Sequence, residues 1–225
     1  ADGPHGVRVY KSTIGDHALD KSKMAESTMF TCEAAMASTF NEELIYKAGE
    51  TIGKECNMFN VDVLLGPGVN LKRSPLAGRN FEYYSEDPYF TGIRGINFIN
   101  GVQITGVGAC IKHFALNEQE TQRRFVNTIV DERTMHEYYF MPFEMALREA
   151  NPYAIMSSYN KVNGHYASES SYLLKNILRD KWGYKGVVIS DWGAVQDKVK
   201  SIKNDKAITI FFIKGKILIK RELHS

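Results

Sequence analysis

The 225-residue sequence lacks any apolar stretch long enough to cross a lipid bilayer. Its longest apolar runs cover residues 154–156, 187–189 and 208–213, whereas a transmembrane helix needs about 20 such residues. We therefore expect no membrane partner. Otherwise the composition, 44% hydrophobic and 24% charged, is that of an ordinary globular protein.

Cysteine is also scarce. The three cysteines, Cys32, Cys56 and Cys110, show no paired spacing and have no histidines at ligand intervals. This pattern argues against a disulfide framework and a zinc site, and it fits a reducing compartment. We expect no metal and no cofactor. The sequence starts at Ala1 without Met, basic leader or secretory segment, so we expect a cytoplasmic protein that is a fragment or has lost its start.

The sequence has little net charge, +2, but this charge is unevenly spread. Residues 198–225 hold eight Lys or Arg and two acidic residues, whereas residues 1–197 hold 20 basic and 24 acidic ones. The mildly acidic body does not favour nucleic-acid binding. The lysines of the tail alternate with aliphatic residues, without aromatic residues arranged to stack on bases, so we expect no nucleic-acid partner.

Short apolar runs alternate with amphipathic segments along the chain. Strands are expected at 61–65, 107–111, 154–158 and 187–190, and helices after the N-cap Asn41 and over 89–103, 131–150 and 172–181. Apolar strands that alternate with helices indicate a parallel sheet covered by helices. The fold class is therefore α/β.

Polar side chains follow three of these strands directly. The clusters are Lys112-His113, Tyr159-Asn160-Lys161 and Asp191-Trp192. In α/β proteins ligands bind at the carboxyl ends of parallel strands. An active site built from these three clusters is therefore the leading hypothesis.

Five segments together resemble glycoside hydrolase family 3, and most of all its β-glucosidase branch. They are DGPHGVR (2–8), GPGVNLKRSPLAGRNFEYYSEDP (66–88), KHFALNEQETQRR (112–124), IMSSYNKVNG (155–164) and WGYKGVVISDWGAV (182–195). Their order and spacing match the family from residue 2 to about residue 201.

The resemblance implies a partial (β/α) TIM-barrel-like domain, without its start, its last strands and the family's C-terminal α/β sandwich domain. It implies a retaining hydrolase of carbohydrate metabolism that acts on terminal β-D-glucosyl residues, with Asp191 as the nucleophile. A retaining enzyme needs a second carboxyl about 5–5.5 Å away as acid and base. Nothing assigns that role here, although Glu118 and Glu120 are nearby in sequence.

The resemblance also implies a set of substrate-binding residues. They are Asp2, Arg79, Lys112, His113, Arg123, Met156, Tyr159 and Trp192. Purely structural roles remain open: Asp191 as a helix N-cap, Lys112-His113 as a buried pair, Met156 and Trp192 as core. Arg79 and Arg123 could instead bind Glu82, Glu86 or Asp87, and Asp2 lies at a terminus, where order cannot be assumed.

Of two related activities, the sequence argues against one and leaves the other open. The N-acetylglucosaminidase branch carries its acid/base histidine in KHFPGHG, which KHFALNEQE (112–120) does not match. β-Xylosidase-type specificity stays open, as does a carbohydrate-binding remnant without catalysis. We expect a small β-glucoside or oligosaccharide as partner and leave homo-oligomer formation open.

Residues 204–225 do not resemble the family. We expect residues 1–203 to form the incomplete barrel and 204–225 a basic tail, with strands at 207–213 and 216–219 pairing as a β-hairpin. We expect this end to reflect a truncated gene or a fragment of a longer enzyme rather than an adapted small sugar-binding protein, and we therefore expect impaired activity. The tail is also a candidate to cover the open edge of the sheet.

Overall fold

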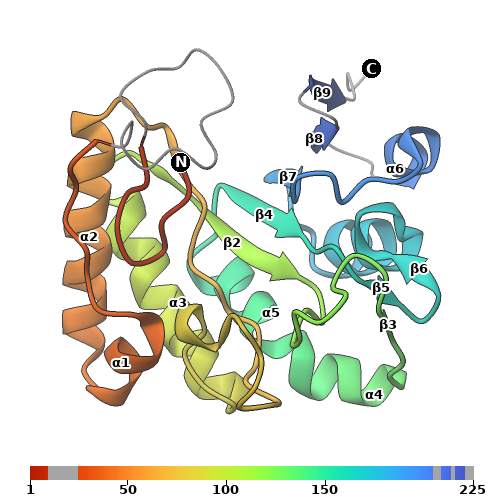
Figure 1. The fold of residues 1–225 in the computed structure, drawn as a ribbon, viewed down its shortest axis with the longest axis horizontal. Helices are drawn as coiled ribbons and strands as arrows, with labels where there is room; N and C mark the ends of the chain where they lie inside the picture. The colour runs from red at the N-terminus through yellow and green to blue at the C-terminus, as the bar shows by residue number, and fades with distance from the viewer. Residues whose placement is uncertain (10–24, 205–208, 214–215, 221–225) are drawn as a thin grey trace.

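The computed structural model describes residues 1–9, 25–204, 209–213 and 216–220 (Figure 1). Its main sheet has the strand order β1-β2-β4-β7-β8-β9. These strands are β1 (Val63–Leu64), β2 (Gly108–Phe114), β4 (Ala154–Ser157), β7 (Val187–Ser190), β8 (Thr209–Ile213) and β9 (Lys216–Lys220). The neighbours from β1 to β8 pair in parallel, and β9 pairs antiparallel with β8. All four strands expected in the body of the chain are present.

The backbone pairing of β8 with β7 confirms that the tail covers the edge of the sheet. The antiparallel partner strands expected in the tail are β8 and β9, whereas the turn between them lies outside the described residues. The division of the chain into two parts at residue 203 remains a prediction.

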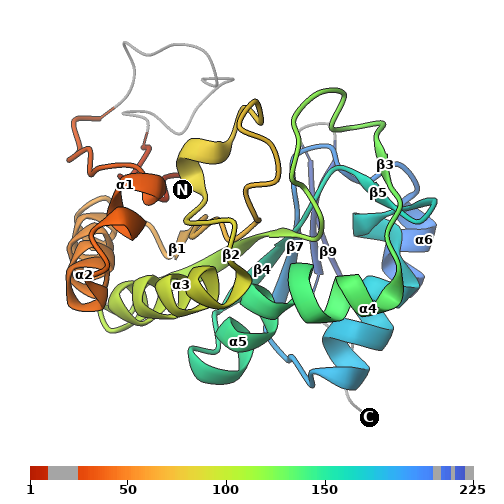
Figure 2. The same ribbon diagram turned by 90° about the horizontal axis from the view of Figure 1, so that it is seen from below.

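Helices flank this sheet (Figure 2). The longer ones are α2 (Glu42–Met58), α3 (Pro88–Gln103), α5 (Met141–Glu149) and the π-helix η5 (Tyr172–Lys181). Short ones are α1 (Glu33–Ser38), η2 (Asn80–Glu82), α4 (Glu132–Thr134), η3 (Met135–Tyr139), η4 (Ala167–Glu169) and α6 (Lys198–Asn204). The Asn41 side chain accepts a hydrogen bond from the Leu44 N–H at 3.0 Å, which confirms the expected N-cap of α2.

The single helix expected over residues 131–150 is wrong. The segment forms α4, the π-helical turn η3 and then α5. Phe140 N–H bonds back to the Met135 carbonyl, and Pro142 follows in the first turn of α5. Proline has no N–H and its ring displaces the preceding turn, so it begins a helix far better than it continues one.

A small second sheet that the sequence pattern did not predict follows β2 and β4. It consists of β3 (Asn127–Thr128), β5 (Lys161–Val162) and β6 (His165–Tyr166), in the order β3-β5-β6. Strands of two residues carry too few side chains for an alternating pattern to be visible.

The start of the chain is held alongside β1. The Ala1 ammonium donates to the Val63 carbonyl at 2.7 Å, and the Leu65 N–H donates to the Ala1 carbonyl at 2.8 Å. Asp2 is thereby fixed next to the end of β1. None of the helices in the described ranges is both long and apolar enough to cross a membrane.

Candidate functional site

The three polar clusters gather at the carboxyl ends of adjacent strands. Lys112 pairs in register with Met156, and Met156 with Ile189, so the ends of β2, β4 and β7 are level. Asp191 is the first residue after β7. The parallel register alone therefore brings Lys112 and Asp191 to one rim.

Asp191 is a nearly buried carboxyl, 9% exposed. Its Oδ2 lies 3.9 Å from the His113 Nε2, and the Tyr159 hydroxyl hydrogen-bonds to it. Burial raises the pKa of Asp191 above its ordinary value, while the Tyr159 hydrogen bond and nearby cations act in the opposite direction. A turn rather than a helix follows Asp191, so it is not a helix N-cap.

His113 is held on two sides. Its backbone N–H donates to the Asn70 Oδ1 at 2.7 Å, and its carbonyl accepts from the Asn70 Nδ2 at 3.0 Å. On the ring, Nδ1 lies 3.2 Å from the Tyr83 hydroxyl. Burial lowers the pKa of His113 well below its ordinary value, and the cations Arg79, Lys112 and Arg123 lower it further. A neutral imidazole therefore faces Asp191.

Asp2 and Lys112 form a second centre on this rim. The Lys112 Nζ donates to the Asp2 Oδ1 at 2.9 Å and lies 3.9 Å from the Glu82 Oε2. The Arg8 Nη1 donates to the Asp2 Oδ2 at 3.0 Å. Burial opposes ionisation of Asp2, but Lys112 and Arg8 together hold its pKa below the ordinary value. Asp2 is thus an ordered carboxylate between two cations.

Arg79 and Arg123 each hold a carboxylate from their own loop. Arg79 donates to Glu82, and the Arg123 Nη1 donates to the Glu120 Oε2 at 2.7 Å. The sequence left open a pairing of Arg79 with Glu82, and the structure shows it. Arg123 pairs with Glu120 and not with Glu86 or Asp87. Both guanidinium groups also lower the pKa of Asp191, so these arginines belong to the site although each is paired with a glutamate.

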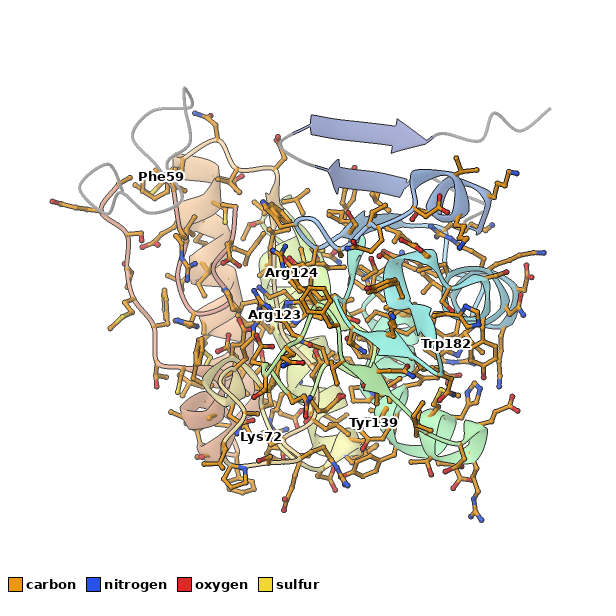
Figure 3. All side chains as sticks on the ribbon, turned by 45° about the vertical axis from the view of Figure 1, so that its right-hand side comes forward. Phe59, Lys72, Arg123, Arg124, Tyr139 and Trp182 are labelled. Carbon is orange, nitrogen blue, oxygen red and sulfur yellow. The ribbon has the colours of Figure 1, made fainter. Side chains whose placement is uncertain are left out.

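Tyr159 lies under two guanidinium groups. The Arg123 and Arg124 carbons are 4.6 Å and 4.9 Å from its ring centroid, which is cation–π distance. Arg124 also donates to the Trp192 carbonyl at 3.4 Å. Figure 3 shows Arg123 and Arg124 beside each other near the middle of the molecule.

The two remaining predicted residues differ in exposure. Trp192 is 44% exposed. Met156 is 2% exposed and packs in an apolar cluster with Cys110, Ala154 and Ile189. The contacts of Met156 are those of a core residue, and its place in a sugar site stays a prediction.

Sequence reasoning missed several residues of this rim. They are Arg8, Asn70, Tyr83, Asn117 and Arg124. All lie inside or next to the five quoted segments, so the segments gave a signal for the region but not for the individual side chains. The described residues contain no group of three or more His, Cys, Asp or Glu side chains suited to a metal ion.

The fold and this rim define the class: a partial parallel α/β barrel with a buried carboxyl and polar donors at its strand ends. The model of the glycosyl hydrolase family 3 N-terminal domain matches residues 19–209. This chain belongs to glycosyl hydrolase family 3. The match extends to residue 209, so it includes the first part of the tail, which was expected not to resemble the family.

The chain is similar to curated proteins that are named as glycosidases. The chain is 49% identical over 201 residues to thermostable beta-glucosidase B of Acetivibrio thermocellus, covering 89% of this chain and 26% of that protein. It is 48% identical over 202 residues to an exo-alpha-(1->6)-L-arabinopyranosidase of Bifidobacterium longum, with the same coverage. The chain thus spans about a quarter of the length of the curated relatives it matches.

A solved structure confirms the fold. Beta-glucosidase 3B from Thermotoga neapolitana, in complex with alpha-D-glucose, superposes with a TM-score of 0.85 at 44% identity. The superposition covers 93% of this chain and 28% of that one. The barrel-like fold expected from the sequence is therefore confirmed as a partial domain.

Proposed function

We propose that this chain carries the sugar-binding and nucleophile-bearing part of a retaining β-glucosidase acting on terminal β-D-glucosyl residues. The observation that supports it most is the Asp191 carboxyl, buried at the end of β7 with the His113 Nε2 3.9 Å away and a Tyr159 hydrogen bond. A carboxylate held on a strand end is positioned rigidly, as attack on an anomeric carbon demands.

In the first step of the proposed reaction, an Asp191 oxygen forms a bond to the anomeric carbon. The bond from that carbon to the leaving-group oxygen breaks, and the oxygen takes a proton from a general acid. Water then gives a proton to the conjugate base of that general acid and bonds to the anomeric carbon as the bond to Asp191 breaks, which restores the original configuration. Burial raises the pKa of Asp191, whereas the Tyr159 hydrogen bond and the rim cations Arg79, Lys112 and Arg123 favour its ionised form.

The acid role is assigned to neither nearby glutamate. Glu120 is engaged by Arg123 at 2.7 Å and by the Asn117 amide at 3.2 Å. Glu118 is partly buried and accepts a hydrogen bond from the Asn70 Nδ2 at 3.3 Å. Aryl leaving groups depart without protonation, so aryl glucosides are the substrates on which this chain should act best.

Asp2, Lys112 and His113 are proposed to bind sugar hydroxyls. The first is an ordered acceptor, and the other two are donors on the same rim. The exposed Trp192 ring suits the apolar C–H face of a pyranose. A matched relative named for an arabinopyranosidase activity supports a second candidate, a different terminal pyranoside.

Mass spectrometry after incubation with a 2-deoxy-2-fluoroglucosyl inactivator tests this proposal. The expected result is one covalent sugar per chain on Asp191, absent in Asp191→Asn. If calorimetry shows glucose binding but no adduct forms, the chain is a carbohydrate-binding remnant rather than an enzyme. If the chain forms no adduct and does not bind glucose, both the enzyme and the carbohydrate-binding remnant are refuted.

A further inference from the structure

We propose that Tyr83 fixes the tautomer of His113, so that Nδ1 accepts a hydrogen bond and the Nε2–H group points to Asp191 and a bound sugar. Tyr83 is 1% exposed, and its ring meets the imidazole edge-on at a centroid distance of 6.2 Å. The hydroxyl lies 3.2 Å from the Nδ1. Because each group can donate or accept, the tautomer depends on where the single hydroxyl proton goes.

The contact with Glu120 determines how the Asn117 side-chain amide is oriented. Its carboxylate can only accept, and the Arg123 guanidinium already donates to it at 2.7 Å. The Asn117 group 3.2 Å from it must therefore be the amide NH₂, since the amide oxygen would face a like charge. The orientation of the Asn117 side chain follows from this contact.

The same NH₂ group lies 3.4 Å from the Tyr83 oxygen. Asn117 therefore donates to Tyr83, and the Tyr83 oxygen serves as an acceptor. Among the described residues, the remaining hydrogen-bond partner of this hydroxyl is the His113 Nδ1. The hydroxyl proton goes to Nδ1, and the imidazole carries its own proton on Nε2.

The surroundings keep both rings in these states. Burial raises the pKa of Tyr83 well above its ordinary value, so the hydroxyl keeps its proton. Burial lowers the pKa of His113, so the ring stays neutral and leaves Nδ1 as an acceptor. Gly68 permits the arrangement, because a Cβ there would come 2.9 Å from the Tyr83 ring.

The consequence is felt at Asp191. With this tautomer an N–H group lies 3.9 Å from the Asp191 Oδ2, whereas the other tautomer would turn a lone pair toward the carboxylate. The same N–H group is the donor for a sugar hydroxyl, a role that rests on the proposed function. Tyr83 is thus a positioning residue that acts through His113.

Two-bond proton–nitrogen NMR on the full chain, labelled with ¹⁵N-histidine and free of sugar, tests the tautomer. The His113 signal, identified by its loss in His113→Gln, should show the Nε2–H form. Tyr83→Phe should shift it toward the Nδ1–H form and weaken glucose binding about five- to tenfold, the equivalent of one hydrogen bond. Tyr84→Phe is the matched control, since the buried Tyr84 hydroxyl has no hydrogen-bond partner among the described residues.

An Nδ1–H or doubly protonated ring in the unsubstituted chain would overturn the proposal. So would a folded Tyr83→Phe chain with an unchanged tautomer. If Tyr83→Phe does not fold, the spectrum of the unsubstituted chain still decides. An Nε2–H ring in a chain that does not bind glucose would contradict the proposed function and leave the tautomer assignment intact.

Discussion

The two faces of the β2-β4-β7 sheet are built differently. On the helix side, Ile111, Ile155 and Val188 join one large apolar cluster. On the inner side, Met156 and Ile189 belong to a separate apolar cluster of described residues, and the strand ends beside it carry charges. Burial of apolar area stabilises the first face, whereas the second places polar groups for chemistry.

Ion pairs offset the cost of burying charged side chains on the inner rim. Lys112 is buried but bonded to Asp2, and Glu82 is buried but bonded to Arg79. Such pairs roughly offset their own desolvation and add little net stability. Stability and ligand binding should therefore separate along the two faces of one sheet.

Phe143→Ala should have the largest effect on stability. Phe143 is fully buried on the helix side and meets Phe114 edge-on at 5.3 Å. Removing such a ring costs about 3–5 kcal/mol. Urea unfolding measures this loss, with Phe125→Ala as the control because Phe125 is 71% exposed. A loss no greater than that of the control would contradict the contrast between the faces.

Glu118→Gln should change stability in a pH-dependent way. Burial raises the pKa of Glu118 to about 7 from 4.5. Between these values the folded chain binds a proton that the unfolded chain does not, so the wild type gains stability as pH falls. Glu118→Gln lacks this gain, and the stability of the wild type relative to it should rise by about 2–3 kcal/mol from pH 8 to 5.

Urea unfolding across this pH range checks the Glu118 prediction. Glu149→Gln is the control, because Glu149 is exposed. A constant difference between wild type and Glu118→Gln would show that the Glu118 carboxyl titrates alike in the folded and unfolded chains.

The strands and the strand-end residues were predictable because both follow from local pattern. Apolar runs gave β2, β4 and β7, and parallel register then placed Lys112 and Asp191 at one rim. The partners of these residues were not predictable in the same way. Tyr83 meets His113 across 30 positions of chain, and Asn70 meets it across 43. Such contacts depend on loop conformation, which no periodicity encodes.

Asp2→Asn should have a smaller effect on stability and a clear one on sugar binding. The pKa of Asp2 is lowered, so its charge stabilises the fold at neutral pH and this contribution fades as pH falls through the lowered value. Asp2 is 40% exposed, so solvent screening limits the loss at neutral pH to about 1–2 kcal/mol.

Glucose affinity, measured by calorimetry, should fall about tenfold in Asp2→Asn, the equivalent of one charged hydrogen bond. The exposed Asp62 provides the control Asp62→Asn. Unchanged affinity in Asp2→Asn would remove Asp2 from the proposed sugar site.

Met156→Leu should have the smallest effect and decides to which part of the inner face Met156 belongs. Its side chain is 2% exposed among apolar neighbours, so a ligand could reach little of it. A swap of similar volume costs about 1 kcal/mol in a packed core. Glucose affinity should stay within about twofold, since burial of so little area contributes little. Met29→Leu, at an exposed position, gives the baseline. A large loss of affinity with stability unchanged would place Met156 in the sugar site and extend the ligand-binding rim down into the barrel.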